Sequence, residues 1–528
     1  MRPRHLLPLA GLVPAILGAQ ASAGAYHVEE TTITQLHAAF KAHTLTCHNL
    51  VQQYLDRIAA YDKQGPAINA VVVLNPKALA IADSLDRRFK KEGLTGPLHC
   101  IPMIVKDNYE TKDLQTTAGS LALKGWIPLQ DATMVHRIRE AGAIVLFKSN
   151  MAEWAFSPFE TVNSILPGYT KNPYALDRVT AGSSGGTAAG VAANEGESGL
   201  GTDTGNSIRG PSAHNALVGI RSTMGLTSRA GVVPLSNSAD IAGPMARTVA
   251  DAVAIFNVVA GEDPDDSVTV ASRGHREADY RKFLVLGGLK GSRIGVLRQA
   301  YERPSTDSDV VKVFANALEE LKRQGATIVD PAGIDSLNAV TRAATPPDTP
   351  SNLRGCNRFK FDLERYLAAR AQNAPVKTIS QVLRSGSFHP SVQLRLQAAN
   401  DSTLPPPEQN PGCSAGEAAN ARLRIAVLDL MDSLRLDALV YPTWSNPPRL
   451  IGDLNTPAGD NSQLFSPRTG FPAITVPMGY TRGNTLPAGM TFFGRPWSEA
   501  KLINLVYEYE QTTHHRRPPA SAPPLKRR

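Results

Sequence analysis

The chain has 528 residues, of which 42% are hydrophobic, 6% aromatic and 19% charged. This composition is typical of a globular protein with a large buried core, and it excludes a disordered chain or a collagen-like fibre. The net charge of +8 is spread along the sequence and forms no dense basic stripe among aromatic residues. A nucleic acid is therefore a poor candidate for the partner of this protein.

The N-terminus has the layout of a secretory signal peptide. Arg2 and Arg4 give a basic start, residues 6–19 are apolar, and Ala21-Ser22-Ala23 matches a small-residue cleavage site. The apolar run of about 14 residues is too short for a bilayer span, which takes about 20. We therefore predict cleavage after Ala23 and a secreted or periplasmic protein with no stable membrane insertion. An uncleaved anchor is the alternative.

Four cysteines, an even number, allow two disulfides in an oxidising compartment. Cys356 and Cys413 lie in the same loop-rich region, so we pair them, which leaves Cys47 with Cys100. Four buried free thiols are the alternative. The sequence has no CxxC or HxxxH spacing, so it predicts no metal site.

Along the chain, helical and strand patterns alternate. Residues 31–61 have the apolar spacing of two amphipathic helices. Short apolar runs bounded by turn residues predict strands at 71–74, 101–105, 144–147, 294–297, 438–441 and 474–476. Helical stretches, such as 133–140 and 310–323, lie between several of these runs. This alternation predicts an α/β fold with a mixed, largely parallel sheet that is covered by helices on both faces.

Two regions depart from this pattern. Residues 262–435 combine helical segments with loops marked by prolines, and residues 516–528 are basic and proline-rich. We expect the latter to be a disordered tail. Without the leader (1–23) and the tail, residues 24–515 are predicted to form a single domain.

Residues 180–211 are so rich in Gly, Ser and Thr that we expect turns presenting backbone N–H groups rather than a packed core strand. A phosphate loop is disfavoured because neither G-x-x-x-x-G-K-[ST] nor G-x-G-x-x-G is present. Gly182–Gly186 fits the G-x-S-x-G nucleophile elbow with Ser184 at its centre, but the segment before it is a poor strand. The third interpretation is a serine activated by Lys106, which follows the apolar run 101–105. Desolvation at that place would lower the pKa of the amine and let it accept a proton.

A series of motifs then resembles the amidase signature family. In chain order they are GPLHCIPMIVKDN (96–108), TTAGS (116–120), KSNMAEWA (148–155), AGSSGG (181–186), GTDTGNSIRGP (201–211) and DIAGP (240–244). Two later segments, TGFPAITVPMGY (469–480) and LPAGMTFFGRP (486–496), look like the C-terminal sheet segments of that family. The resemblance covers roughly residues 30–512 and implies one α/β/α domain with a large mixed central sheet, in agreement with the strand and helix pattern.

The resemblance also implies a Ser–cis-Ser–Lys catalytic triad. Ser207 would be the nucleophile, Ser183 the bridging serine after a cis peptide bond from Gly182, and Lys106 the base. The backbone N–H groups of the oxyanion hole would come from Thr204, Gly205, Asn206 and Ser207. The residues expected to support the site are Ser184 as a hydrogen-bonding residue, and Asp203 and Arg209 as an ion pair.

Two positions depart from the family pattern. Asn206 stands where the family commonly has glycine, and we expect its side chain to narrow the acyl side of the pocket. Gly210 stands where a bulkier apolar residue is common, and we expect it to open space there. Trp154 is expected to lie in the core rather than in the pocket. The segment Tyr441-Pro442-Thr443-Trp444, which follows a predicted strand, is a candidate for a pocket wall.

The resemblance thus implies a secreted amidase that hydrolyses the linear amide C–N bond of a small-molecule substrate through an acyl-enzyme, with no cofactor. Candidate substrates are aryl or alkyl amides, C-terminal peptide amides and carbamates. One alternative is the A subunit of a glutamine-dependent tRNA amidotransferase, against which the leader argues. Another is a non-catalytic binding protein on an amidase scaffold, against which intact Lys106, Ser183 and Ser207 argue.

Overall fold

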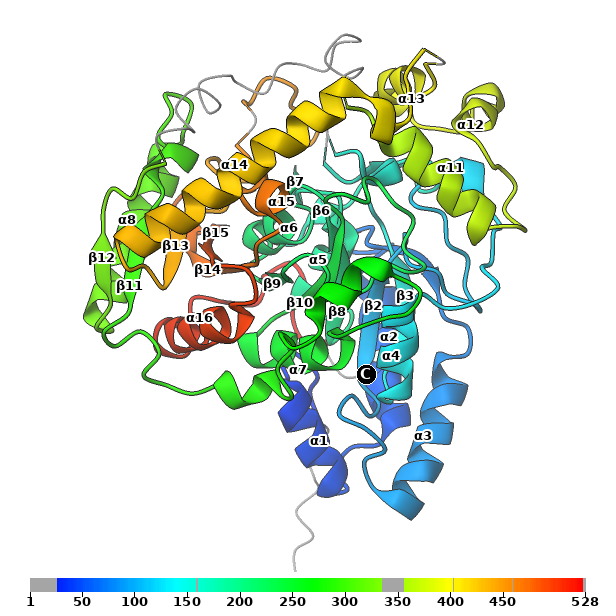
Figure 1. Cartoon of the computed structure of the whole chain (residues 1–528). Helices are drawn as coiled ribbons and strands as arrows, with labels where there is room; N and C mark the ends of the chain where they lie inside the picture. Colours follow the sequence, from blue (N-terminus) through cyan, green and yellow to red (C-terminus); the bar gives the residue numbers. More distant parts are fainter. Residues whose placement is uncertain (1–25, 158–159, 335–355, 402, 458, 526–528) are drawn as a thin grey trace, which may run out of the picture.

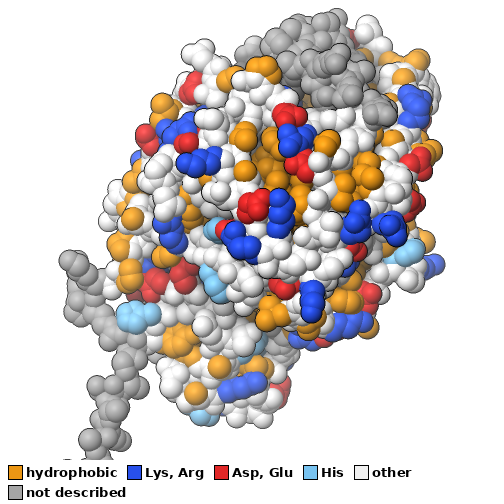
Figure 2. Space-filling model, turned by 90° about the vertical axis from the view of Figure 1, so that its left-hand side faces the viewer, with side chains coloured by type: hydrophobic (Ala, Val, Ile, Leu, Met, Phe, Trp, Pro, Cys, Tyr) orange, Lys and Arg blue, Asp and Glu red, His pale blue; other side chains and the backbone are white. Residues whose placement is uncertain are grey.

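The computed structural model describes residues 26–157, 160–334, 356–401, 403–457 and 459–525 (Figure 1). The predicted leader, with its cleavage site, lies outside the described residues. In the part of the chain that is described, no helix is both long and apolar enough to cross a membrane. On the face shown in Figure 2, basic and acidic side chains are interspersed, as the even spread of charge in the sequence predicts.

An 11-stranded mixed sheet forms the centre of the molecule (Figure 1). Its strands, in spatial order, are β1 (Val71–Leu74), β3 (Ile144–Ser149), β2 (Pro102–Lys106), β8 (Ser198–Asp203), β10 (Ile241–Ala246), β9 (Val218–Arg221), β14 (Ala473–Thr481), β15 (Leu486–Phe493), β13 (Ala438–Pro442), β11 (Arg293–Val296) and β12 (Thr327–Val329). Two small two-stranded sheets are formed by β4 (Val162–Asn163) with β5 (Gly168–Tyr169), and by β6 (Lys171–Asn172) with β7 (Ala175–Val179). The six strands predicted from apolar runs are all present. The sheet is not largely parallel, however, because the central strands from β8 to β13 pair antiparallel.

Helices pack along the sheet from one end to the other. They are α1 (Ile33–Lys41), α2 (Cys47–Tyr61), α3 (Ala78–Glu92), α4 (Thr133–Glu140), α5 (Gly185–Ala192), α6 (Arg209–His214), α7 (Val249–Val259), α8 (Ser308–Arg323), α11 (Phe359–Ala369), α12 (Ile379–Ser385), α13 (Gln393–Ala399), α14 (Pro411–Ser433), α15 (Ser466–Thr469) and α16 (Glu499–Thr513). The two helices predicted within residues 31–61 are α1 and α2, each begun by a threonine whose side chain accepts a backbone N–H. The apolar core has one large cluster around β2 and β3 and another around β13 to β15.

The prediction that the Gly/Ser/Thr-rich segment forms no core strand is wrong, because β8 is a buried strand next to β2 and β10. Its glycines make room for neighbouring side chains. A Cβ atom at Gly199 would lie 2.4 Å from Cγ2 of Thr187, and one at Gly201 would lie 2.7 Å from Sδ of Met245. At these glycines, the strand is packed by the side chains of its neighbours.

Both predicted disulfides are present. Cys47 at the start of α2 is bonded to Cys100, and Cys356 is bonded to Cys413 near the start of α14. The second bond closes the region that contains α11, α12 and α13. An apolar cluster joins these helices to Trp154, which is 2% exposed and belongs to the core, as predicted.

The prediction of a disordered C-terminal tail is wrong for the residues that the structure describes. Arg516 forms an ion pair with Glu30 at 2.7 Å. Further along, the carbonyl groups of Ala522 and Pro523 accept hydrogen bonds from the buried guanidinium of Arg57 at 2.8 and 3.1 Å. The sequence pattern of prolines and charges does not reveal these partners, because Arg57 and Glu30 lie more than 460 positions away.

Candidate active site

Lys106 and Ser183, the expected base and bridging serine, are in contact. Lys106 is the last residue of β2, and Ser183 lies in the turn between β7 and α5. Nζ of Lys106 lies 2.7 Å from Oγ of Ser183, and both side chains are fully buried. The Gly182–Ser183 peptide bond is cis. The fold thus brings together two side chains that are 77 positions apart in the chain.

Thr202 completes the surroundings of the Lys106 amine. Its Oγ1 lies 2.7 Å and its carbonyl oxygen 3.4 Å from Nζ, and Asn108 donates a further hydrogen bond to Oγ1 at 3.1 Å. A neutral amine has two N–H bonds and one lone pair. When the two oxygens of Thr202 accept the N–H bonds, the lone pair is left for the hydroxyl proton of Ser183. Thr202 and Asn108 were not identified from the sequence, although both lie within the motifs that carried the resemblance.

The protonation of Lys106 is set by burial. Desolvation lowers the pKa of its amine to about 7, against the opposing effect of the Asp203 and Asp240 carboxylates. Much of the amine is therefore neutral near neutral pH and able to accept a proton. This is the property expected of Lys106 from its place at the end of a buried strand.

Ser207 lies in the nucleophile loop, which we define as residues 204–207, between β8 and α6. Its side chain is 4% exposed and makes no hydrogen bond within the described part of the chain. Three carbonyl groups in and just before this loop are held by the protein: that of Asp203 by Arg221, that of Gly205 by Arg209 at 2.6 Å, and that of Asn206 by the N–H of Gly210 at 2.8 Å.

These anchored carbonyls determine where the loop's N–H groups point. The C=O and N–H of a trans peptide unit point in opposite directions. The N–H groups of Thr204, Asn206 and Ser207 share peptide units with the three anchored carbonyls, so they are turned away from those contacts. Donors arranged in this way can stabilise an oxyanion that forms at a carbonyl attacked by Ser207.

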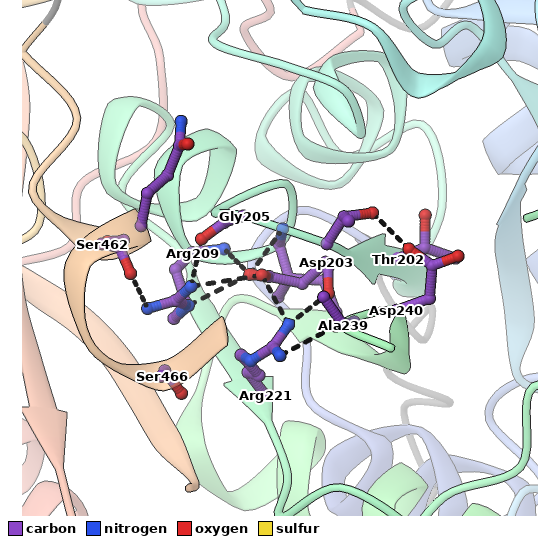
Figure 3. Close-up of polar contacts among 12 residues, drawn as sticks. Thr202, Asp203, Gly205, Arg209, Arg221, Ala239, Asp240, Ser462 and Ser466 are labelled. Carbon is purple, nitrogen blue, oxygen red and sulfur yellow. Dashed lines mark hydrogen bonds and ion pairs between the residues drawn. The ribbon is translucent and has the colours of Figure 1, made fainter. Parts of the chain in front are cut away.

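Asp203 braces the loop from within the protein. It pairs with Arg209 at 3.0 Å and with Arg221 at 2.9 Å, and all three side chains are fully buried (Figure 3). Burial raises the pKa of the Asp203 carboxyl, but the two guanidinium groups outweigh this effect and lower it to about 2. Arg221 was not identified from the sequence, which indicated only the pair with Arg209.

Ser184, the centre of the alternative elbow motif, contacts β8, the strand that also contacts the Lys106 amine. Its Oγ donates to the carbonyl of Thr202 at 3.2 Å and accepts from the N–H of Thr202 at 3.3 Å. It therefore contacts the backbone of the residue that holds the Lys106 amine.

The expectation that Gly210 opens space beside the pocket is wrong. A Cβ atom at Gly210 would lie 2.8 Å from Cζ3 of Trp444 and 3.0 Å from Nδ2 of Asn206. The indole of Trp444 and the Asn206 carboxamide thus already occupy this space. The two departures from the family pattern form one packed unit, which lies next to the nucleophile.

Among the residues that the structure describes, there is no group of three or more His, Cys, Asp or Glu side chains that could hold a metal ion. The contacts of Lys106, Ser183 and the nucleophile loop are made by hydroxyls, backbone amides and charged side chains. Their arrangement suits proton transfer between oxygen and nitrogen atoms and the stabilisation of a negative charge.

Comparison with known proteins agrees with this chemistry. The model of the Amidase family matches residues 49–503. The chain is 33% identical to a probable amidase of Arabidopsis thaliana, over 94% of this chain and 92% of that protein. It is 34% identical to the A subunit of the glutamyl-tRNA(Gln) amidotransferase of Acinetobacter baumannii, over 91% and 96% of the two chains.

The structural comparison gives the same result. The native peptide amidase from Stenotrophomonas maltophilia superposes with a TM-score of 0.81 at 36% identity, covering 93% of this chain and 98% of that one. The match to the family model covers most of the chain, and the fold and the site chemistry agree with it. The chain therefore belongs to the amidase signature family, whose reaction is the hydrolysis of amide C–N bonds.

Proposed function

We propose that this protein hydrolyses small amides through a triad of Ser207, Ser183 and Lys106. The observation that carries the proposal is the 2.7 Å contact between Nζ of Lys106 and Oγ of Ser183, made by a fully buried amine with a pKa of about 7. A buried lysine that is partly neutral can act as a general base at the pH where most enzymes work.

In the proposed reaction, the Lys106 amine takes the hydroxyl proton of Ser183, and Ser183 takes the proton of Ser207. Oγ of Ser207 attacks the amide carbonyl, and the oxyanion is stabilised by the N–H groups of the nucleophile loop. When the C–N bond breaks, the proton returns through Ser183 to the leaving nitrogen. Water then hydrolyses the acyl-enzyme, with the same groups moving the proton, and regenerates Ser207.

C-terminal peptide amides are the substrate class that we favour, with ammonia as the leaving group. The similarity to the peptide amidase of Stenotrophomonas maltophilia supports this choice. Aryl or alkyl amides and carbamates are the other substrates to compare. The leader predicted at residues 1–23 and the two disulfides support secretion or a periplasmic location.

The first experiment is labelling of the mature protein with a fluorophosphonate probe, followed by peptide mass mapping. We expect an adduct on Ser207. An adduct on Ser184 would instead support the elbow mechanism, and a folded protein that takes no label would support the non-catalytic scaffold.

Substitution tests the roles of the individual triad residues. We expect Ser207→Ala to abolish release of ammonia from a peptide amide, and Ser183→Ala and Lys106→Ala to lower kcat by about a thousandfold or more, since members of a triad act together. Ser433→Ala, at an exposed position at the end of α14, is the matched control and should keep full activity. Full activity in Ser207→Ala would overturn the proposal.

The A subunit of an amidotransferase is the second candidate, because such proteins are among the relatives. In that role, the protein would release ammonia from glutamine only together with partner subunits. We expect hydrolysis of a peptide amide by the isolated chain, with no dependence on other proteins. Glutaminase activity that appears only on addition of partner subunits would favour the amidotransferase instead.

A further inference from the structure

Asp240 links the nucleophile loop to the neighbouring strand. It lies directly before β10 and is 5% exposed. Figure 3 shows Asp240 beside Asp203 and Ala239. Oδ1 of Asp240 accepts a hydrogen bond from the hydroxyl of Thr204 at 2.5 Å, and its Oδ2 accepts the N–H groups of Leu235 and Ser236 at 2.9 Å each. The backbone of residues 235 and 236 therefore fixes the Asp240 carboxylate, and this carboxylate binds Thr204, the first residue of the nucleophile loop.

Thr204 is the loop residue through which a side-chain contact can position the N–H donors. Within the described residues, the Asn206 and Ser207 side chains make no hydrogen bond and Gly205 has no side chain. The second half of the loop is held by Arg209, which binds the carbonyl of Gly205 at 2.6 Å. The first half is held by Arg221, which binds the carbonyl of Asp203, and by the side-chain contact between Thr204 and Asp240.

The charge of Asp240 also acts on the base. Asp203 and Asp240 are the two carboxylates that favour the ammonium form of Lys106. Asp203 is neutralised by two arginines at close range, whereas Asp240 forms no ion pair among the described residues. Arg221 and Arg229 act on Asp240 only over a longer distance.

We propose that Asp240 is a positioning residue for the hydrolysis: it fixes the nucleophile loop through Thr204 and supplies a negative charge that acts on Lys106. This inference rests on the proposed function, in which the loop donates to the oxyanion and Lys106 is the base. Two variants separate the hydrogen bond from the charge.

Asp240→Asn removes the charge and can keep the contacts. The amide oxygen can accept the N–H groups of Leu235 and Ser236, and the NH2 group can donate to the hydroxyl oxygen of Thr204. Without the negative charge, the ammonium form of Lys106 is less favoured. We expect the acidic limb of the kcat/KM profile for a peptide amide to move to lower pH, with kcat on the plateau changed by less than about threefold.

Thr204→Val removes the hydrogen bond and keeps the charge. We expect kcat to fall by about tenfold to a hundredfold, because the donors are no longer held at the oxyanion, with little change in KM and no movement of the acidic limb. A residue with a merely structural role would not produce these two separate effects.

Asp362→Asn is the matched control. Asp362 is also a buried carboxylate that accepts a hydrogen bond from the same turn, at the N–H of Asn237, but it does not touch the nucleophile loop. We expect its kcat and its pH profile to match those of the unmodified protein. The thermal midpoint of each variant shows that it is folded.

The outcomes distinguish the inference from the proposed function. An unmodified protein without label on Ser207 and without hydrolysis would overturn both. Suppose instead that the unmodified protein is labelled and active. Two results would then overturn the inference alone: an acidic limb that does not move in Asp240→Asn, or a kcat of Thr204→Val equal to that of the unmodified protein.

Discussion

The chemistry at the residue scale depends on the protonation of one amine. Burial lowers the pKa of Lys106 to about 7, and the amine must be neutral to take the proton of Ser183. Below pH 7 the ammonium form dominates and cannot accept a proton. The fluorophosphonate labelling rate of Ser207 should therefore rise with pH through about 7 and level off above it.

The measurement is the second-order labelling rate on either side of pH 7. Lys106→Arg is the control, because a guanidinium stays charged throughout this range and should label slowly at every pH. A rate that is independent of pH in the unmodified protein would show that Lys106 is not the base.

A second residue-scale prediction concerns the packing of Gly210. In Gly210→Ala, the new methyl group would lie 2.8 Å from Cζ3 of Trp444 and 3.0 Å from Nδ2 of Asn206. Overpacking of this kind costs about 1–3 kcal/mol, and here it acts directly on the residue before Ser207. We expect kcat for a peptide amide to fall about tenfold.

In the double variant Gly210→Ala/Trp444→Phe, the phenyl ring is smaller than the indole and leaves room for the new methyl group. This variant should recover part of the lost activity. Gly416→Ala is the matched control, because it also adds a methyl group to a helical glycine but meets no atom within 4 Å. If Gly210→Ala were as active as Gly416→Ala, the packed unit of Asn206, Gly210 and Trp444 would have no role in activity.

At the scale of elements, β8 depends on the missing side chains of its glycines. In Gly199→Ala, the new Cβ would lie 2.4 Å from Cγ2 of Thr187 and 2.9 Å from the backbone carbonyl of Ile104. We expect the free energy of unfolding to fall by about 1–3 kcal/mol, measured by urea denaturation.

Thr187→Ser removes the methyl group that the new Cβ would meet and keeps the hydroxyl that contacts Ser149 at 2.7 Å. Added to Gly199→Ala, it should restore part of the lost stability. No loss of stability in Gly199→Ala would contradict the close packing of β8.

The region that contains α11, α12 and α13 is connected to the site through aromatic packing. Phe359 of α11 packs against Phe156 with a ring-centre distance of 4.7 Å. The neighbouring Ser157 is close to the cis peptide, since a Cβ at Gly182 would lie 3.1 Å from Cβ of Ser157. The region closed by the Cys356–Cys413 disulfide is therefore in contact with the segment beside the bridging serine.

At the scale of the whole molecule, the C-terminal segment (residues 516–525) is held by Glu30 and Arg57, which lie early in the chain. Arg57 is fully buried and donates to the carbonyl groups of Ala193, Asn194, Ala522 and Pro523. A protein that lacks residues 518–528 leaves some of these donors without partners. We expect a loss of about 1–3 kcal/mol in the free energy of unfolding and a lower thermal midpoint.

Deletion of residues 526–528 alone is the control, since it keeps Ala522 and Pro523. Scanning calorimetry of the two truncated proteins beside the full chain gives the comparison. Equal thermal midpoints for all three would mean that the C-terminal segment contributes nothing to stability.

Much of the fold was predictable from the sequence because its signals are local. The apolar spacing of residues 31–61 and the short runs such as 71–74 and 438–441 reveal helices and strands within a few positions. The motifs around Lys106 and Ser207 likewise carry the resemblance in continuous stretches. The pairing of the four cysteines followed from their number and their regions.

Tertiary structure alone decided the features that depend on distant neighbours. The glycines of β8 become part of a core strand because side chains from other elements fill the space above them. The space beside Gly210 is closed by Trp444, and the C-terminal segment is ordered by Arg57. The amine of Lys106 is held by the hydroxyl of Thr202, 96 positions away. Local sequence patterns cannot show such contacts, because packing and hydrogen bonding join residues by their place in space and not by their order in the chain.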